Sequence, residues 1–406
     1  MPKKTWFLFL TILIDMIGVG VLIPVIPQLL GEPSSPAFLL GPGQQHLGFI
    51  LLGFLMAVYP IAMFFASPIL GSLSDKYGRR PVLLISILGT SIGYFLFAYA
   101  IMTKNIPLLF ISRMFDGLTG GNIATVQAAI ADQVKIENRA KAFGMIGAAF
   151  GLGFILGPFI GGKLADQSLV PWFSATIPFI FAGILALINL ASIYFFFSET
   201  NEHIDKDRKI NFFGAIGNIM KAKKMTEIRH LLIVALLFNA GFAFFTSFFN
   251  VYLTTKFNYT PGQIGNFFGY VGMCVVFTQL VIVRFVSKKY DQINILRFAI
   301  PATGFALLLY LLPTQAWWIF VIALIFAIPN GIQQANFSAL LSKRIDPTKR
   351  GEVLGISASV NSIGQSVPPL LAGVIAVIFA PWTPIFIAGL FIISAGILFR
   401  FTEKKV

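Results

Sequence analysis

Long apolar runs separated by short charged segments constrain this chain more than any other feature of its sequence. Two of these runs, 47–70 and 81–102, are each long enough to cross a bilayer as a helix. The segment Gly71–Arg80 between them reads Gly-Ser-Leu-Ser-Asp-Lys-Tyr-Gly-Arg-Arg, and we expect a charged loop with glycine where the backbone turns. Its basic residues outnumber its one acid, which predicts that this loop lies in the cytoplasm.

The whole chain follows the same pattern. Only 11% of its residues are charged and 57% are hydrophobic, whereas a soluble domain carries about 25% charged residues. We therefore predict an all-α membrane protein with twelve transmembrane helices in two pseudo-symmetric six-helix halves. The predicted spans are 6–30, 47–70, 81–102, 106–131, 142–164, 172–197, 230–255, 262–286, 293–313, 316–341, 352–379 and 382–401. The predicted domains are residues 1–197, a cytoplasmic linker at 198–229, and residues 230–406.

Basic residues gather on alternate loops of this arrangement. The opposite loops hold only Lys104, Lys163 and Lys256, so we expect both termini in the cytoplasm. The net charge of +14 then reflects topology and attraction to membrane lipids, and does not indicate nucleic-acid binding. The linker contains a candidate surface helix with apolar residues at Ile210, Phe212, Phe213, Ile216 and Ile219. The apolar segment from Trp6 is too long for a signal peptide, and we interpret it as a retained first helix.

The chain also repeats itself. Arg139, Gly144, Gly153, Pro158 and Gly162 recur at equal spacing as Arg350, Gly355, Gly364, Pro369 and Gly373. A degenerate copy of the first loop recurs at 284–290, where Lys288 takes the place of Asp75. Such a repeat predicts two parallel halves around a central cavity.

Three charged side chains lie deep within predicted spans: Asp15 in the first span, and Arg113 and Asp116 in the fourth. A charge there costs several kcal/mol unless it is protonated or paired. Arg113 and Asp116 are three residues apart, so they share a helix face and could neutralise each other. Two alternatives stay open: Asp15 could merely cap or bridge helices, and the pair could be a static packing contact. The repeat places Leu324 and Ala327 at the positions of the pair, so the second half folds without it.

Uncharged polar residues within the predicted spans suit an amphipathic organic substrate. The candidate cavity residues are Gln28, Asn122, Gln127, Asn239, Asn250, Gln333, Gln334, Asn336 and Asn361. We find no nucleophile–base constellation and no metal-ligand cluster, and the single cysteine, Cys274, excludes an intrachain disulfide. We therefore expect neither an enzyme nor a cofactor.

Four stretches of the chain resemble signatures of one family. Gly71-x-Leu73-x-Asp75-x-x-Gly78-Arg79-Arg80 resembles the loop between helices 2 and 3 of the major facilitator superfamily, although an ordinary basic turn is the alternative. The run Gly153-x-x-x-Gly157-Pro158-x-x-Gly161-Gly162 is similar to the helix 5 signature of its drug–proton antiporter branch. Arg113-x-x-Asp116-Gly117-x-x-Gly120-Gly121-Asn122 resembles helix 4 of the tetracycline-resistance-like group, and Asp15-x-x-Gly18-x-Gly20 resembles helix 1.

The resemblance implies roles for these residues. Arg113 is tied to proton coupling in that group, and Asp15 and Asp116 are the acids available for a relay. Asp75 would lie at the amino end of the span at 352–379, and Arg79 or Arg80 would meet Asp132. The expected conformational latch comprises Gly71, Asp75, Gly78, Arg79, Arg80 and Asp132, and the expected helix-packing residues are Gly153, Gly157, Pro158, Gly161 and Gly162.

The function that we expect is proton-coupled antiport, exporting amphipathic small molecules or drugs across the cytoplasmic membrane by alternating access. Tetracycline exporters carry an aspartate in helix 3, but this chain reads Ile92-Gly93-Tyr94 there, which argues against a metal–tetracycline chelate. We expect a monomer with protons, a small organic substrate and membrane lipids as partners. The alternatives are a proton symporter for a metabolite or lipid-like substrate, and a non-transporting membrane receptor.

Overall fold

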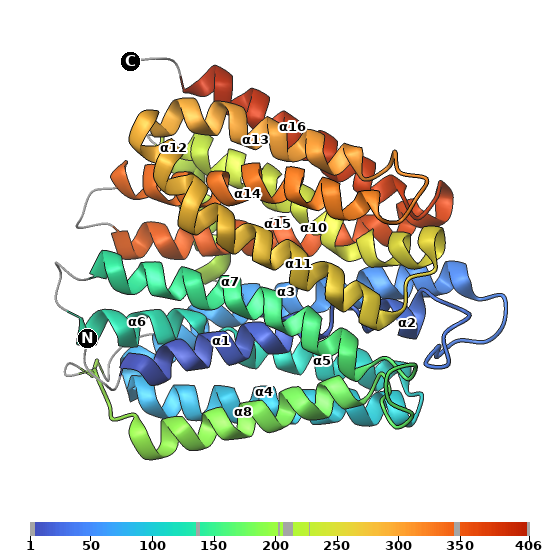
Figure 1. The fold of residues 1–406 in the computed structure, drawn as a ribbon. Coiled ribbons are helices and arrows are strands. Elements are labelled where there is room, and N and C mark those ends of the chain that lie inside the picture. Colours follow the sequence, from blue (N-terminus) through green and yellow to red (C-terminus); the bar gives the residue numbers. More distant parts are fainter. Residues whose placement is uncertain are drawn as a thin grey trace. The chain divides into compact units, whose positions relative to one another are not determined.

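The regular elements of this protein are helices throughout the part of the chain that the structure, a computed structural model, describes (Figure 1). The described residues are 5–134, 139–201, 204–205, 214–226, 228–344 and 350–403. Among them, eleven segments are long and apolar enough to cross a membrane. The predicted all-α membrane architecture is confirmed.

The helices of the first part of the chain are α1 (Thr5–Val21), α2 (Ile26–Leu30), α3 (Gln45–Tyr77), α4 (Arg79–Met102), α5 (Ile106–Gly120), α6 (Ile123–Gln133), α7 (Arg139–Leu164) and α8 (Ile177–Phe196). They are followed by α9 (Gly214–Lys224), α10 (Arg229–Phe257), α11 (Pro261–Phe277), the π-helical segment η2 (Thr278–Ile282), α12 (Val283–Lys289), α13 (Gln292–Leu309), α14 (Trp318–Lys343), α15 (Arg350–Ile378) and α16 (Thr383–Thr402).

The chain forms two compact units. Unit 1 comprises residues 1–42, 58–215 and 260–266, and unit 2 comprises 43–57, 216–259 and 267–406. In unit 1, α1 packs along α7 and α8, while α4 packs along α5 and α8. In unit 2, α10 packs along α15 and α16, while α13 packs along α14 and α16. The helices of the two units pack in the same pairwise scheme, as an internal sequence repeat requires.

Glycine lets α1 and α7 approach until their backbones touch. A Cβ atom at Gly157 would lie 2.7 Å from the Cα atom of Gly20, and one at Gly161 would lie 2.5 Å from the carbonyl oxygen of Val21. Gly153 likewise leaves room for the Met16 side chain. Within lipid, such close packing replaces the hydrophobic driving force that holds soluble helices together.

Three predicted spans are interrupted. The first breaks at 22–25, where Pro24 lacks an amide hydrogen, and the eighth contains η2. The fourth was predicted as one helix over 106–131, but it divides into α5 and α6 at Gly121 and Asn122. Consecutive glycines weaken a helix, and Gly121 approaches the backbone of Ser67 in α3. The matching helix of unit 2, α14, is continuous.

The prediction of a loop over Gly71–Arg80 is wrong. Helix α3 continues through Tyr77 and α4 begins at Arg79, so only Gly78 lies between the two helices. Its backbone has φ 100° and ψ 157°, a conformation that a residue with a Cβ atom rarely adopts. A single-residue turn of this kind is the reason that glycine is needed here.

Glu199, which the sequence analysis did not single out, completes this turn. Its carboxylate accepts the backbone N–H groups of Arg79 (2.8 Å) and Arg80 (3.0 Å), which are unpaired donors at the start of α4. Partial burial acts to raise the pKa of Glu199, but these backbone hydrogen bonds outweigh it and hold the pKa below its ordinary value. A Cβ atom at Gly78 would lie 2.4 Å from the Glu199 carboxylate.

Helix α9 occupies the predicted linker. Ile216 and Ile219 lie in it, whereas Ile210, Phe212 and Phe213 fall outside the described residues. Its Asn218 side chain donates to the hydroxyl of Ser359 in α15 (3.1 Å), which attaches the helix to unit 2.

We predict that Gly78→Ala lowers the stability of the protein by roughly 1–3 kcal/mol, because alanine strains this backbone and its Cβ atom displaces the Glu199 carboxylate. Gly71→Ala is the matched control, since a Cβ atom there meets nothing within 4 Å and Gly71 is helical. Thermal unfolding in detergent measures both. Equal melting temperatures for the two variants would contradict this account of the turn.

Candidate functional site

The centre of unit 1 holds a buried ion pair. Arg113 Nη1 donates to Asp116 Oδ2 at 2.8 Å, and the two side chains are only 6% and 4% exposed. Both come from α5, seven and four residues before its last residue, Gly120. The spacing of three residues places them on one face of the helix.

Tyr59 in α3 covers the arginine. The guanidinium carbon of Arg113 lies 4.2 Å from the centre of the Tyr59 ring, in a cation–π contact. The glycines of α5 make this contact possible, because a Cβ atom at Gly117 would lie 2.6 Å from the Tyr59 carbonyl oxygen and one at Gly120 would lie 2.6 Å from its hydroxyl. Sequence reasoning missed Tyr59, since a tyrosine within an aromatic-rich span has no distinguishing pattern.

Asp15 in α1 belongs to the same cluster. It interacts electrostatically with Asp116, and the side chain of Asn122 is its polar neighbour. Within the described part of the chain, the buried Oδ2 of Asp15 and both amide atoms of Asn122 lack a hydrogen-bond partner of good geometry. Asn122 is fully buried at the break between α5 and α6. The interrupted helix thus places an amide with unused hydrogen-bonding capacity beside a carboxylate.

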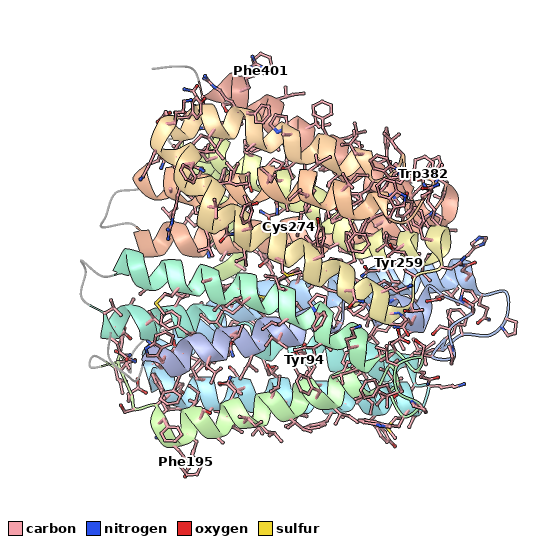
Figure 2. The ribbon with its side chains drawn as sticks, viewed as in Figure 1. Tyr94, Phe195, Tyr259, Cys274, Trp382 and Phe401 are labelled. Carbon is pink, nitrogen blue, oxygen red and sulfur yellow. The ribbon has the colours of Figure 1, made fainter. Side chains whose placement is uncertain are left out.

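Helix α4 closes the cluster from another side. Its Gly93 packs against Asp116, where an added Cβ atom would lie 3.1 Å from the Asp116 Cβ atom. The neighbouring Tyr94, labelled in Figure 2, is 4% exposed and places its hydroxyl against Gly18 of α1. Thr90 of α4 shares a hydrogen bond with Thr119 of α5 (3.2 Å). Four helices, α1, α3, α4 and α5, therefore surround two acids and one base.

A second charged cluster lies at the α3–α4 turn. Arg79 donates to Asp75 Oδ1 (2.6 Å), to Asp132 Oδ2 at the end of α6 (3.1 Å) and to the hydroxyl of Ser74. Arg80 instead donates to the carbonyl oxygen of Tyr194 in α8 and stacks on its ring. Of the two arginines that the sequence analysis considered, Arg79 is therefore the partner of Asp132. The approach of Asp75 to the start of α15 stays a prediction.

Asp166, in the loop after α7, anchors the start of α11. Its carboxylate accepts hydrogen bonds from Ser168, from the hydroxyl of Thr260 (2.8 Å) and from the backbone N–H of Gly262 (3.0 Å). Burial acts to raise the pKa of Asp166, but these hydrogen bonds hold it below its ordinary value. Close to it, Gly162 of α7 lies against Pro261 and Gly265 of α11. The sequence analysis did not find this contact, because its two sides are far apart in the chain.

The candidate cavity residues differ in burial. Gln127, Asn239, Gln334 and Asn361 keep exposed or partly exposed side chains. The others are at most 7% exposed: Gln28, Asn122, Asn250, Gln333 and Asn336. Gln28 also donates to the carbonyl oxygen of Pro24, in the break between α1 and α2, and Asn336 donates to that of Ile332 in α14. A substrate would reach the buried residues only after a rearrangement.

Unit 2 presents paired amides and closely packed aromatic rings. Asn239 of α10 donates to Asn361 of α15 (3.0 Å), and Gln279 of η2 donates to Gln334 of α14 (3.3 Å). Unit 2 also contains a cluster of packed rings: Phe245, Phe249, Phe267, Tyr310 and Phe326. The sequence did not indicate this cluster, because phenylalanine is so abundant in the chain that no local pattern stands out. Among the described residues, no group of His, Cys, Asp and Glu side chains is placed to hold a metal ion.

Comparison with known proteins places these features in context. Residues 8–369 match the family described as the Major Facilitator Superfamily. The chain is 30% identical to the tetracycline resistance protein, class H, of Pasteurella multocida, over 91% of this chain and 88% of that protein. It is 29% identical to multidrug resistance protein 1 of Bacillus subtilis (strain 168), over 92% of this chain and 91% of that protein. The crystal structure of the human organic anion transporter MFSD10 has a similar fold, with a TM-score of 0.73 and 20% identity, covering 98% of this chain and all of that one.

We predict that the Arg113–Asp116 pair behaves as one energetic unit. Arg113→Leu and Asp116→Ala, the residues at the matching positions of α14, should each lower the free energy of unfolding by about 3–5 kcal/mol, because each leaves a buried charge unpaired. The double variant should lose less than the sum of the two. Reversible unfolding in mixed detergent micelles measures this cycle. Simple additivity would show that the two side chains are not coupled.

Proposed function

The chain belongs to the Major Facilitator Superfamily, and on that premise we propose that it is a proton-coupled antiporter exporting amphipathic small molecules, drugs among them. Its relatives include proteins named for resistance to tetracycline, to quinolones and to multiple drugs, which supports drug export as the activity. The gathering of basic residues on alternate loops supports an inner-membrane orientation with both termini in the cytoplasm. We propose a monomer as the working unit, surrounded by membrane lipids.

The observation that carries this proposal is the buried cluster of Asp15, Arg113 and Asp116. With both acids ionised, the cluster has one negative charge in excess, and the low dielectric of the membrane disfavours such a charge. Binding one proton neutralises the cluster. An amphipathic cation entering the unit would do the same. The proton and the cationic substrate therefore compete to neutralise the same excess negative charge, which is the physical requirement for exchange.

Arg113 makes this competition switchable. Protonation of Asp116 removes its charge from the 2.8 Å contact, and the guanidinium then keeps its contact with the Tyr59 ring. The broken helix α5–α6 allows adjustment there, because Asn122 has donors and acceptors ready for either protonation state of Asp15. We propose that Asp116 and Asp15 share the transported proton. We further propose that Arg113 transmits the change in protonation to α3 through its contact with Tyr59.

The proposed substrate site uses the uncharged groups. Amide pairs such as Asn239–Asn361 and the aromatic cluster of unit 2 suit a flat, amphipathic molecule, and Gln334 of the same unit adds a polar side chain that is exposed. In α4, Gly93 packs directly on Asp116. Because position 93 is a glycine, α4 supplies no carboxylate there beside Asp116. A broad range of organic substrates fits this lining better than a metal chelate does.

The Arg79 cluster is the proposed conformational latch. Asp75 and Asp132 hold the arginine from α3 and α6, and Gly78 and Glu199 fix the turn between α3 and α4. We propose that these contacts form and weaken as the two units alternate in access. The proposed latch also includes Gly71, whose carbonyl oxygen accepts a hydrogen bond from the Ser74 hydroxyl, and Arg80, which donates to the carbonyl oxygen of Tyr194.

We predict that Asp116→Asn abolishes uphill transport, because an amide cannot carry the proton, while substrate binding remains measurable. The test adds lipophilic cations to the purified protein in unbuffered detergent solution and records proton release. Glu32→Gln, which removes an acid from the loop after α2, is the control and should leave proton release intact. Full release from Asp116→Asn would refute its coupling role. In vesicles, substrate accumulating with the imposed proton flux instead of against it would indicate symport.

We predict that Asp75→Asn slows turnover several-fold without changing substrate preference, since it removes one of the two carboxylates that hold Arg79. Initial rates of drug efflux for three unrelated substrates measure this. Lys76→Gln, at the neighbouring residue, changes the net charge by one unit in the opposite direction without touching Arg79 and should retain its rate. A changed order of substrates in Asp75→Asn would argue against a latch.

A further inference from the structure

Five residues of η2 and α12 line a cavity of about 310 Å³ on unit 2: Leu280, Val281, Arg284, Phe285 and Lys288. Arg284 and Lys288 are one helical turn apart, so their charged ends project from the same face. The apolar residues are accessible as well, and Phe285 is 73% exposed and Leu280 56% exposed. The cavity therefore combines two cations with an open apolar wall.

The opposite face of this segment is firmly attached to unit 2. Ile282, Val283 and Val286 pack against the buried core formed by Ile295, Ala299 and Ile332. This packing fixes the rotation of the helix. The Arg284–Lys288 face is therefore turned outward because the other face is already filled.

These two cations have no protein counter-charge in the part of the chain described here. Neither Arg284 nor Lys288 forms an ion pair with an acid among these residues. The degenerate repeat makes the contrast clear: at the matching turn in unit 1, Asp75 and Asp132 neutralise Arg79, whereas Lys288 stands at the position of Asp75. A basic pair that is left without an acid attracts an external anion.

The position of the cavity indicates which anion. It lies at the end of the span Pro261–Lys289, at the same end of unit 2 as the carboxyl end of α16 (Figure 1). In the orientation proposed above, this is the cytoplasmic surface, where anionic phospholipids are concentrated. Long basic side chains there reach the headgroup level, while neighbouring apolar residues stay among the acyl chains.

We propose that this cavity binds the phosphate of an anionic phospholipid from the cytoplasmic leaflet. Arg284 and Lys288 hold the phosphate group, and Leu280, Val281 and Phe285 contact the upper part of the acyl chains. The π-helical turn of η2 precedes Val283, so an occupant of the cavity contacts the segment whose Gln279 donates to Gln334. Lipid bound here is therefore placed to influence the polar lining of unit 2.

The test is native mass spectrometry of the full chain with phosphatidylglycerol and phosphatidylcholine. The wild-type protein should retain phosphatidylglycerol preferentially, and Arg284→Gln with Lys288→Gln should lower that affinity by roughly 25-fold, about 5-fold for each charge. Phosphatidylcholine binding should not change. Lys223→Gln with Lys224→Gln, on the exposed side of α9, removes an equal charge and is the matched control.

Any of three other outcomes would overturn the proposal. Equal losses in both double variants would show that total charge attracts the lipid and that the cavity is not a site. Displacement of phosphatidylglycerol by millimolar inorganic phosphate would show a free-anion site instead of a lipid site. Retention of full lipid preference by Arg284→Gln with Lys288→Gln would exclude the cavity directly. Unchanged thermal unfolding in lipid-free detergent confirms that the variants are folded.

Discussion

Burial of opposite charges within apolar helices is the constraint on which unit 1 depends. Arg113 and Asp116 are each almost fully buried, and either alone would cost several kcal/mol in a membrane. Their contact, together with the ring of Tyr59, makes the arginine tolerable. Asp15 leaves the cluster with one acid too many, so its charge balance is complete only with a further positive charge. The site thus carries an unbalanced negative charge, which suits a protein that exchanges cations for protons.

Backbone contact between helices makes room for this cluster. Glycines bring α1 against α7 and α5 against α3, and the space that a side chain would need is filled by the neighbouring backbone or ring. The same glycines weaken helical continuity, and the fourth span breaks at Asn122, beside the acids. In this chain, therefore, tight packing and local irregularity arise from the same residues. A break is acceptable there because Gly121 and Asn122 are buried inside the protein and do not face lipid.

The two repeats have diverged in charge while keeping their packing scheme. Unit 1 holds the buried ion pair and the neutralised arginine of the α3–α4 turn. Unit 2 has apolar residues at the positions of the pair, a continuous α14, paired amides and closely packed aromatic rings. Its basic residues at the end of α12 have no acid beside them in the described chain, in contrast to Arg79. One unit is therefore suited to proton chemistry, and the other to contacts with organic molecules and lipid.

The sequence by itself determined the architecture, because the length of each apolar run and the side on which lysine and arginine gather are local properties that lipid imposes directly. It also indicated Asp15, Arg113 and Asp116, since a charge in an apolar run stands out without any structure. Only the tertiary structure decided which groups meet these charges. Tyr59, Glu199 and Asp166 act through partners distant in the chain, and no periodicity reveals such pairings.

The structure also replaced the predicted loop at Gly71–Arg80 with a turn at Gly78 alone. Charged residues usually indicate a loop, but here hydrogen bonds to Glu199 and ion pairs with Arg79 let both helices extend until they almost meet.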